Sequence, residues 1–341
     1  MAYSSAILIN ERGVYMIKDQ RNLLPISEPI IFTYSKYASM TSILSVHKEC
    51  YEWTYLNFLE LIYIRDLVSH VFWYELRECN PDTVWTSEWE MCPYLESCQF
   101  ETSSIGYNDF IEFAINNINQ GNYIYLDLYA PAINNFHNKF RGNHDLLISG
   151  YDTLNKKFIC SDYFDTTFST QEISFDEINS SFEMKRVKEQ RTDYNYLLAY
   201  KNATGIRYTE NDLFKKITKL ISSKSICCLE PQDKHEVYFY SGIETYNWLL
   251  EDMKQGYLNY GDVRVFSIIK EHVRVLNILT QQFGMEIESY ASRLTNIAEI
   301  LVNLSLKYCI DQKEQTKNKI ENNLRLLYQY ECSYLNRLSE F

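Results

Sequence analysis

The chain has 341 residues, of which 46% are hydrophobic and 23% are charged, so its composition is that of a folded globular protein rather than a disordered one. Its formal net charge of −12 and its pI near 5.1 argue against broad electrostatic binding to nucleic acid or to an anionic membrane surface. A chain of this length usually forms more than one hydrophobic core, so two domains are expected.

Targeting signals and metal motifs are not evident in the sequence. The segment 1–19 has no basic stretch followed by an apolar core, and no run approaches about 20 apolar residues, so we expect a cytoplasmic protein without a membrane span. The nine cysteines are an odd number without regular spacing, which predicts reduced thiols. Cys92 and Cys98 lack a second pair at zinc-ligand spacing, and Cys227 and Cys228 are adjacent, so we predict no metal and no cofactor.

The first third of the chain reads as mainly helical. After an apolar run at Ile30 and a turn-like Thr-Tyr-Ser, apolar residues recur at helical spacing from Tyr37 to His47, which places Ser35 at or near a helix N-terminus. Two further helices are predicted over residues 52–64 and 107–117.

The middle of the chain changes to short runs of aromatic and aliphatic residues, which predict strands of one antiparallel sheet. These runs are residues 123–129, 145–151, 157–162 and 194–200. Residues 152–155 suit a hairpin turn between the second and third runs. Ser174 and Glu177 form a capping-box pattern that opens a short helix ending at Phe182.

No convincing strand pattern follows residue 205, so the sequence predicts an α+β domain over residues 1–204 and an all-α helical bundle over residues 205–341. Ser241 and Glu244 resemble a second capping box. Three apolar stripes at helical spacing indicate helices that cover one another: Val265, Ile268, Ile269, Val275, Leu276, Leu279 and Phe283; Leu294, Ile297, Leu301, Leu304 and Tyr308; Ile320, Leu324, Leu327, Tyr334 and Leu338.

The strongest chemical pattern is a histidine and an aspartate on a predicted hairpin. His144 begins one strand and Asp162 ends its partner, so antiparallel pairing brings both to the same edge of the sheet, within reach of a side-chain hydrogen bond. A carboxylate there can orient an imidazole and stabilise the imidazolium. The alternative from the residues alone is a loop histidine and a strand-terminating aspartate.

The text HDLLISGYD, followed by FICSDYF and ISFDEINSSF, resembles the His-hydrophobic-Gly-Tyr and Asp block of two related groups over roughly residues 25 to 201. These are the papain-like bacteriocin-leader peptidases and the butirosin-biosynthesis-protein-H-like acyltransferases, the latter including amide-forming papain homologues. The resemblance implies a papain-like cysteine-peptidase fold. It also implies that His144 and Asp162 are the catalytic pair.

Those families place a cysteine nucleophile at the N-terminus of the first long helix, where the helix dipole lowers a thiol pKa. The matching position is Ser35, which departs from the family pattern. Either serine is the natural residue, or an engineered change removed a cysteine, or catalysis has been lost. Cys50 is the alternative nucleophile, because Glu49-Cys-Tyr-Glu-Trp also begins a predicted helix. Without chemistry, Ser35 would be an ordinary N-cap and Cys50 a small buried hydrophobe.

Many of these relatives carry a glutamine about six residues before the nucleophile to complete an oxyanion hole, but this chain has Pro29 there. Backbone N–H groups or the Asn143 side chain would then stabilise an oxyanion. His137 is a further candidate for contact with substrate or for an alternative base.

Two basic clusters interrupt the acidic average: Lys185, Arg186, Lys188 and Arg191, and Lys215, Lys216 and Lys219. They suit an acidic acyl or peptidyl carrier protein with a phosphopantetheine arm, although a solvated helix face, the more common origin of a charge run, explains the same residues. The resemblance favours an acyl or peptidyl transferase of secondary metabolism that moves an acyl group from a carrier-protein thioester to an amine. The alternatives are a cysteine peptidase and a non-catalytic binding module, and a homodimer remains open.

Overall fold

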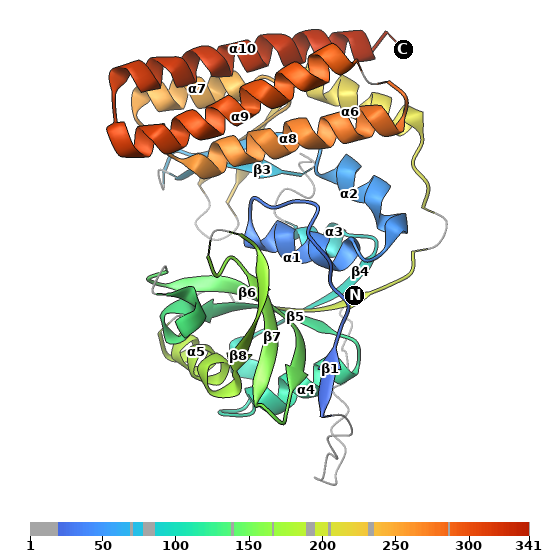
Figure 1. Ribbon diagram of the computed structural model, residues 1–341, viewed down its shortest axis with the longest axis vertical. Coiled ribbons are helices and arrows are strands. Elements are labelled where there is room, and N and C mark those ends of the chain that lie inside the picture. Colours follow the sequence, from blue (N-terminus) through green and yellow to red (C-terminus); the bar gives the residue numbers. More distant parts are fainter. Residues whose placement is uncertain are drawn as a thin grey trace.

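The computed structural model describes residues 20–68, 71–77, 86–137, 140–165, 167–188, 195–203, 206–230, 235–285 and 287–340. The N-terminal segment 1–19, on which the expectation of no signal peptide depends, lies outside these ranges. Within them the chain has an α+β architecture with two antiparallel sheets and a set of C-terminal helices, arranged as stacked layers (Figure 1).

The larger sheet has seven strands in the order β4-β9-β5-β6-β7-β8, with β1 pairing with β6 from outside this path. The strands predicted at residues 123–129 and 157–162 have these bounds in the structure, and the other two agree within two residues; Tyr194 lies outside the described residues. The strand bounds are β1 Arg21–Leu23, β4 Leu95–Phe100, β5 Tyr123–Tyr129, β6 Asn143–Asp152, β7 Lys157–Asp162, β8 Ser169–Ser174 and β9 Asn195–Tyr200.

Helices cover both faces of this sheet (Figure 1). On one face α4 (Phe110–Asn119) and α5 (Phe175–Lys188) contact β5 and enclose a separate apolar cluster. On the other face α1 (Ser35–Leu44) contacts β6 and β7. The predicted capping box at α5 is confirmed, because the Glu177 N–H donates to the Ser174 hydroxyl and the Ser174 N–H donates to the Glu177 carboxylate.

The second sheet corrects the sequence prediction. Its four strands run in the order β10 (Lys224–Leu229), β11 (Glu236–Ser241), β2 (Leu61–Asp66) and β3 (Val71–Leu76). The helix expected over residues 52–64 ends early, as α2 (Tyr51–Asn57), and the apolar run that follows it is β2. A short continuous apolar run fits a buried strand as well as a buried helix, so its periodicity could not decide between them.

Five helices form the layer above this sheet: α6 (Glu210–Ser222), α7 (Thr245–Gln255), α8 (Val263–Gln282), α9 (Glu288–Asp311) and α10 (Glu314–Leu338) (Figure 1). The predicted apolar stripes of α8 and α10 are almost entirely buried, and Leu294, Ile297 and Leu301 bury the middle of α9. The predicted capping box at Ser241 is wrong, because Ser241 ends β11 and Glu244 is the N-cap of α7.

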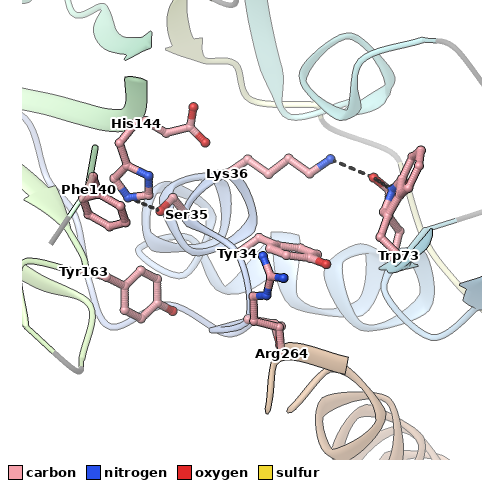
Figure 2. Close-up of a pocket in the computed structure, with 11 residues that line it drawn as sticks. Tyr34, Ser35, Lys36, Trp73, Phe140, His144, Tyr163 and Arg264 are labelled. Carbon is pink, nitrogen blue, oxygen red and sulfur yellow. Dashed lines mark hydrogen bonds and ion pairs between the residues drawn. The ribbon is translucent and has the colours of Figure 1, made fainter. Parts of the chain in front are cut away.

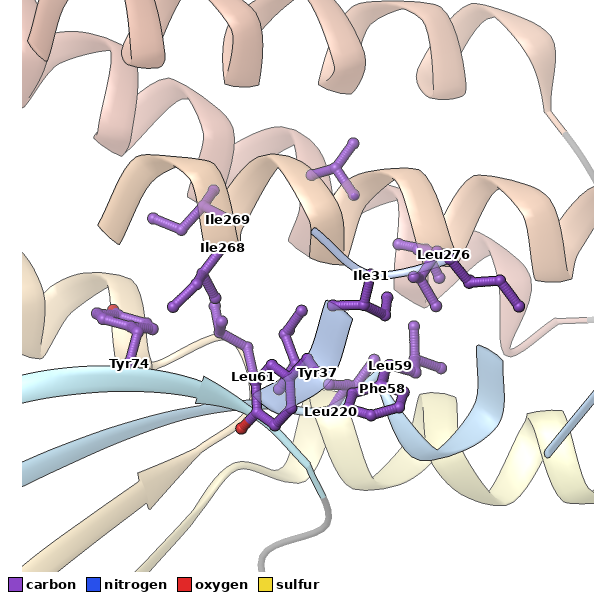
Figure 3. Close-up of a cluster of buried hydrophobic side chains, with 14 of the residues drawn as sticks. Ile31, Tyr37, Phe58, Leu59, Leu61, Tyr74, Leu220, Ile268, Ile269 and Leu276 are labelled. Atoms are coloured by element: carbon purple, nitrogen blue, oxygen red, sulfur yellow. The ribbon is translucent and has the colours of Figure 1, made fainter. Parts of the chain in front are cut away.

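The predicted boundary between residues 204 and 205 does not separate two cores. One hydrophobic cluster joins residues from α1, β2, α6 and α8, as Figure 3 shows for Tyr37, Leu61, Leu220 and Ile268. Because β11 pairs with β2, the C-terminal part shares its sheet with the N-terminal part and is not an all-α bundle. Among the described residues, none of the helices combines the length and apolar character needed to cross a membrane.

Candidate active site

Ser35 is the first residue of α1, as the sequence predicts, but it is not the N-cap. Tyr34 occupies the N-cap position with an extended backbone and no side-chain cap. The Tyr34 carbonyl accepts the first helical hydrogen bond, from the Ala38 N–H at 2.8 Å. The Ser35 hydroxyl is therefore free of a capping role, and the amides of the first turn have no acceptor within the helix.

A β-bulge decides that His144 and Asp162 share a face of the β6–β7 pair. The register shifts between Ile148 and Gly150, and beyond the shift Leu147 lies opposite Ser161. Continuing this register places Asp162 opposite Leu146, on the same face as His144 and diagonal to it. Without the extra residue, Asp162 would lie opposite Leu147 and face the other side. Antiparallel pairing brings the two residues together as expected, with the bulge as an additional requirement.

The side chains of Ser35, His144 and Asp162 meet in a compact triangle, of which Figure 2 shows the Ser35–His144 side. The Ser35 hydroxyl donates to Asp162 Oδ1 at 2.6 Å, and His144 Nε2 lies 2.9 Å from Asp162 Oδ2. Ser35 Oγ and His144 Nε2 are 3.5 Å apart. His144 and Asp162 follow Ser35 by 109 and 127 positions in the sequence, and both meet it at the start of α1. The predicted serine, histidine and aspartate lie within hydrogen-bond reach of one another.

The triangle differs from a linear relay in which a histidine uses one ring nitrogen for the nucleophile and the other for the carboxylate. Here Nε2 faces both partners, and the serine proton points to Asp162. For the imidazole to remove that proton, the Ser35 hydroxyl must rotate towards Nε2. The separation of 3.5 Å is at the outer limit of a hydrogen bond and needs only a small shift to close.

Two phenylalanines hold the imidazole plane. The Phe140 ring stacks on His144 at 3.6 Å between centroids, and Phe136 meets the same ring edge-on at 5.5 Å. Phe136 is buried, so the ring of His144 is fixed between two apolar surfaces. The sequence predicted no role for either residue. Their spacing of four and eight residues before His144 was the available signal, but it carried no motif.

The triangle opens into a pocket of about 780 Å³. Its walls are rich in aromatic side chains, and they also carry both signs of charge. The lining residues are Thr33, Tyr34, Ser35, Lys36, Trp73, Glu75, Phe140, His144, Asp145, Tyr163 and Arg264. A concave, mostly apolar pocket with a few convergent polar groups is typical of a small-molecule site. Figure 2 shows that Arg264 reaches this pocket from α8.

Charges near the nucleophile position neutralise one another. The Lys36 ammonium lies 3.2 Å from Glu75 and 2.9 Å from Glu88, while Arg77 lies 2.5 Å from Glu75. Burial alone would lower the pKa of Lys36, but the two carboxylates raise it well above its usual value. Burial raises the pKa of the neighbouring pocket carboxyl, Asp145. The pocket therefore holds a paired ammonium beside Ser35 and a carboxyl whose pKa is raised by burial.

Cys50, the alternative nucleophile, does not line the pocket. It ends a 3-10 turn beyond the C-terminus of α1, whereas Ser35 begins that helix. Ten helical residues span about 15 Å, which separates the two ends of α1. Burial raises the pKa of the fully buried Cys50 thiol to about 12. Cys50 is packed as a small buried hydrophobe, which corrects its candidacy as a nucleophile.

Asn143 and His137 are also outside the pocket lining. The Asn143 amide donates to Asp127 Oδ2 at 3.3 Å, so it is directed at another carboxylate rather than at Ser35. His137 is exposed and ends a short 3-10 turn with a left-handed backbone, at φ 49°. The structure therefore does not bring either residue to the pocket lining beside Ser35, and their substrate-binding roles stay predictions.

Most of the described side chains in the basic clusters have partners inside the molecule. Lys185 is 2% exposed and lies 3.0 Å from Asp127, while Arg186 donates to the carbonyls of Thr102 and Ile105. Lys219 lies 2.8 Å from Glu60, and Arg191 is outside the described residues. Among the described residues, Lys185, Arg186 and Lys219 are therefore held by internal partners, whereas Lys215 is exposed and lies 3.2 Å from Asp212.

The eight cysteines in the described ranges all have free thiols. In the same ranges, no three or more His, Cys, Asp or Glu side chains are arranged to hold a metal ion. No protein-family model matches the chain, and no curated protein is similar to it.

Proposed function

We propose that the chain is an acyltransferase with a papain-like fold, in which Ser35, His144 and Asp162 carry the reaction. The observation that supports this most is the meeting of the three side chains at the start of α1, on the wall of a pocket large enough for a small molecule. A hydroxyl, an imidazole and a carboxylate at the positive end of a helix are the groups that acyl transfer uses.

In the proposed reaction the Ser35 oxygen attacks the carbonyl carbon of a thioester, and His144 takes the hydroxyl proton. The carbon–sulfur bond breaks, and the leaving thiolate takes that proton from the imidazolium, which leaves an ester on Ser35. An amine then attacks this ester, gives a proton to His144 and forms the amide, while the Ser35 oxygen recovers the proton. Asp162 stabilises the imidazolium between these steps, because its Oδ2 lies 2.9 Å from Nε2.

Backbone amides supply the oxyanion hole in this proposal. The first-turn N–H groups of α1 have no acceptor within the helix and lie beside the attacking oxygen. Pro29 replaces the glutamine of the resembling families and adds no side-chain donor, and the Asn143 amide donates to Asp127. An oxyanion held by fewer donors implies slow turnover.

We propose a carrier-protein thioester as acyl donor and an amine as acceptor, in the cytoplasm, where free thiols persist. An extended phosphopantetheine arm could deliver its acyl group into the aromatic pocket without a large protein contact. This matters because the basic clusters have internal partners and offer little docking surface. A peptidase would use the same three residues, and the ratio of hydrolysis to aminolysis separates the two reactions.

The test is an acyl-enzyme adduct. The protein is incubated with a small acyl thioester, and intact-mass spectrometry follows the mass gain in the wild type, Ser35→Ala and Ser35→Cys. We expect an adduct in the wild type, a faster one in Ser35→Cys because a thiol exchanges readily with a thioester, and none in Ser35→Ala. Ser39→Ala, one turn further along α1, is the matched control and should behave as the wild type.

A non-catalytic binding module is the second candidate, because the Ser35 proton points to Asp162 rather than to His144. In that case neither the wild type nor Ser35→Cys would form an adduct, although a thioester analogue would still bind. An adduct on another residue, located by peptide mapping, would contradict both proposals.

A further inference from the structure

The segment before Ser35 is held by side chains from the adjacent helix α1 and from the distant helix α8. The N–H groups of Ile30 and Ile31 both donate to the Thr41 hydroxyl of α1, each at 3.1 Å. The next two, of Phe32 and Thr33, donate to the Glu271 carboxylate of α8, that of Thr33 at 3.0 Å. Four consecutive backbone donors thus have side-chain acceptors immediately before the nucleophile position.

Glu271 makes three contacts with this segment. One carboxylate oxygen accepts from the Phe32 N–H, and the other accepts from both the N–H and the hydroxyl of Thr33. Glu271 is 7% exposed, and it lies more than 230 residues from its partners in the sequence. Arg274, one turn further along α8, donates to the Ile30 carbonyl and lies 4.0 Å from the Glu271 carboxylate. Side chains from one face of α8 therefore hydrogen-bond to the backbone of residues 30–33.

The contact lies next to the pocket rather than at a remote interface. Thr33 lines the pocket together with Ser35, and Arg264, two turns before Glu271 on α8, lines it as well. Only Tyr34 separates Thr33 from Ser35, so a shift of this segment moves the Ser35 hydroxyl relative to His144 and Asp162. A displacement of about 1 Å is enough to lower a reaction rate by orders of magnitude.

We propose that Glu271 is a positioning residue that sets the place of Ser35 against His144 and Asp162, so that α8 of the C-terminal part belongs to the active centre. The inference rests on the proposed function only in taking Ser35 as the reacting residue. It assigns no contact with substrate to Glu271, whose carboxylate acts through the backbone of Phe32 and Thr33. It also explains why the helical layer and the larger sheet form one unit around the pocket.

Glu271→Gln is the sharpest test, because it keeps the shape of the side chain but puts an NH₂ group against an N–H or hydroxyl donor. The variant is made in the Ser35→Cys background, and the rate of alkylation of the thiol at position 35 by iodoacetamide is measured against pH by peptide mapping. His144 and the helix start favour a thiolate there. Compared with the Ser35→Cys protein, we expect the alkylation rate at neutral pH to be about 10-fold lower. The midpoint of the pH profile should shift upward, towards the pKa of a free thiol, about 8.5.

Glu299→Gln in the same background is the matched control, because exposed Glu299 pairs with Lys270 of α8 at 3.3 Å but touches nothing before Ser35. It should leave the rate and the midpoint unchanged. Thr33→Val removes only the hydroxyl contact with Glu271, and we expect it to slow alkylation about 2- to 3-fold. If Glu271→Gln does not fold, an unchanged alkylation rate in Thr33→Val overturns the proposal. A folded Glu271→Gln protein with the rate and midpoint of the Ser35→Cys variant overturns the proposal.

The readout does not need acyl transfer. If the wild type forms no acyl-enzyme, the proposed function fails, and the alkylation profile still reports whether Glu271 positions residue 35. If the acyl-enzyme does form, its rate of formation in Glu271→Gln should fall about 10-fold with an unchanged KM, since substrate contacts are retained.

Discussion

Two histidine–carboxylate pairs in this protein share the same chemistry and differ in their surroundings. His144 and Asp162 are 2.9 Å apart, and the histidine side chain is 21% exposed to the pocket. His272 and Glu331 are 2.8 Å apart, and both side chains are 1% exposed. The pair itself therefore does not mark a reactive site.

The His272–Glu331 pair is closed to solvent and fully hydrogen-bonded. His272 Nδ1 lies 2.6 Å from the Leu59 carbonyl, and the Tyr246 hydroxyl donates to the second oxygen of Glu331 at 2.7 Å. These contacts tie α7, α8 and α10 to the chain entering β2. The His144 pair, in contrast, accepts a serine proton and faces a pocket. Access from the pocket and a neighbouring nucleophile therefore mark a candidate reactive pair, whereas a buried pair with all its hydrogen bonds formed stabilises the fold.

The largest expected effect is on the open pair. Asp162→Asn keeps the volume of the side chain but removes the charge that stabilises an imidazolium at His144. We expect the rate of acyl-enzyme formation to fall about 10⁴-fold, the loss seen when a triad carboxylate is replaced by an amide. Stopped-flow or quenched mass measurements give the rate, and circular dichroism confirms the fold. A rate within tenfold of the wild type would show that Asp162 has no part in the chemistry.

The closed pair should behave in the opposite way. Glu331→Ala leaves the buried His272 imidazole without its carboxylate partner, so we expect the free energy of unfolding to fall by about 3–5 kcal/mol. The acylation rate of the folded fraction should stay within about 2-fold of the wild type. Glu314→Ala on the same helix is the control, because the exposed pair with Lys317 is expected to contribute at most about 1 kcal/mol. Equal losses in the two variants would contradict the comparison.

The closed pair also predicts a pH dependence of stability. Burial alone would lower the pKa of His272, but the Glu331 charge, its hydrogen bond and the Leu59 carbonyl raise it above the usual 6.5. A histidine with a raised pKa in the folded state stabilises the fold fully below its unfolded pKa, and this stabilisation is lost as pH rises through the folded pKa. The difference in unfolding free energy between the wild type and His272→Gln should therefore shrink from pH 6 upwards in urea titrations. A difference that grows with pH would refute it.

The smallest effect is expected at Cys50. Because burial raises its thiol pKa to about 12, Cys50 should resist iodoacetamide at pH 8 in the native protein, whereas exposed Cys98 should be labelled. Cys50→Ala should change the rate of acylation by less than about 2-fold. Rapid native labelling of Cys50 would return it to the list of candidate nucleophiles.

Local patterns predicted much of the larger sheet and of the candidate site. The strands at residues 123–129 and 157–162 and the α5 capping box depend on neighbouring residues, which is why they could be read directly. A hairpin and a helix start have local signatures, so the positions of His144, Asp162 and Ser35 could be predicted, whereas their catalytic roles were implied by the family resemblance. The second sheet was missed, because β2 and β11 are joined by pairing across more than 160 residues, and no local period encodes that pairing.

The sequence by itself determined which residue types lie at the helix start and on the hairpin, and which apolar stripes must be buried. Only the tertiary structure decided that a bulge before Gly150 turns Asp162 to the side of His144, and that α8 holds the segment before Ser35 through Glu271. It also decided that Cys50 is buried beyond the C-terminus of α1, outside the pocket lining. The physical reason is that register and packing depend on contacts between distant segments, whereas spacing in the sequence specifies only what lies within one element.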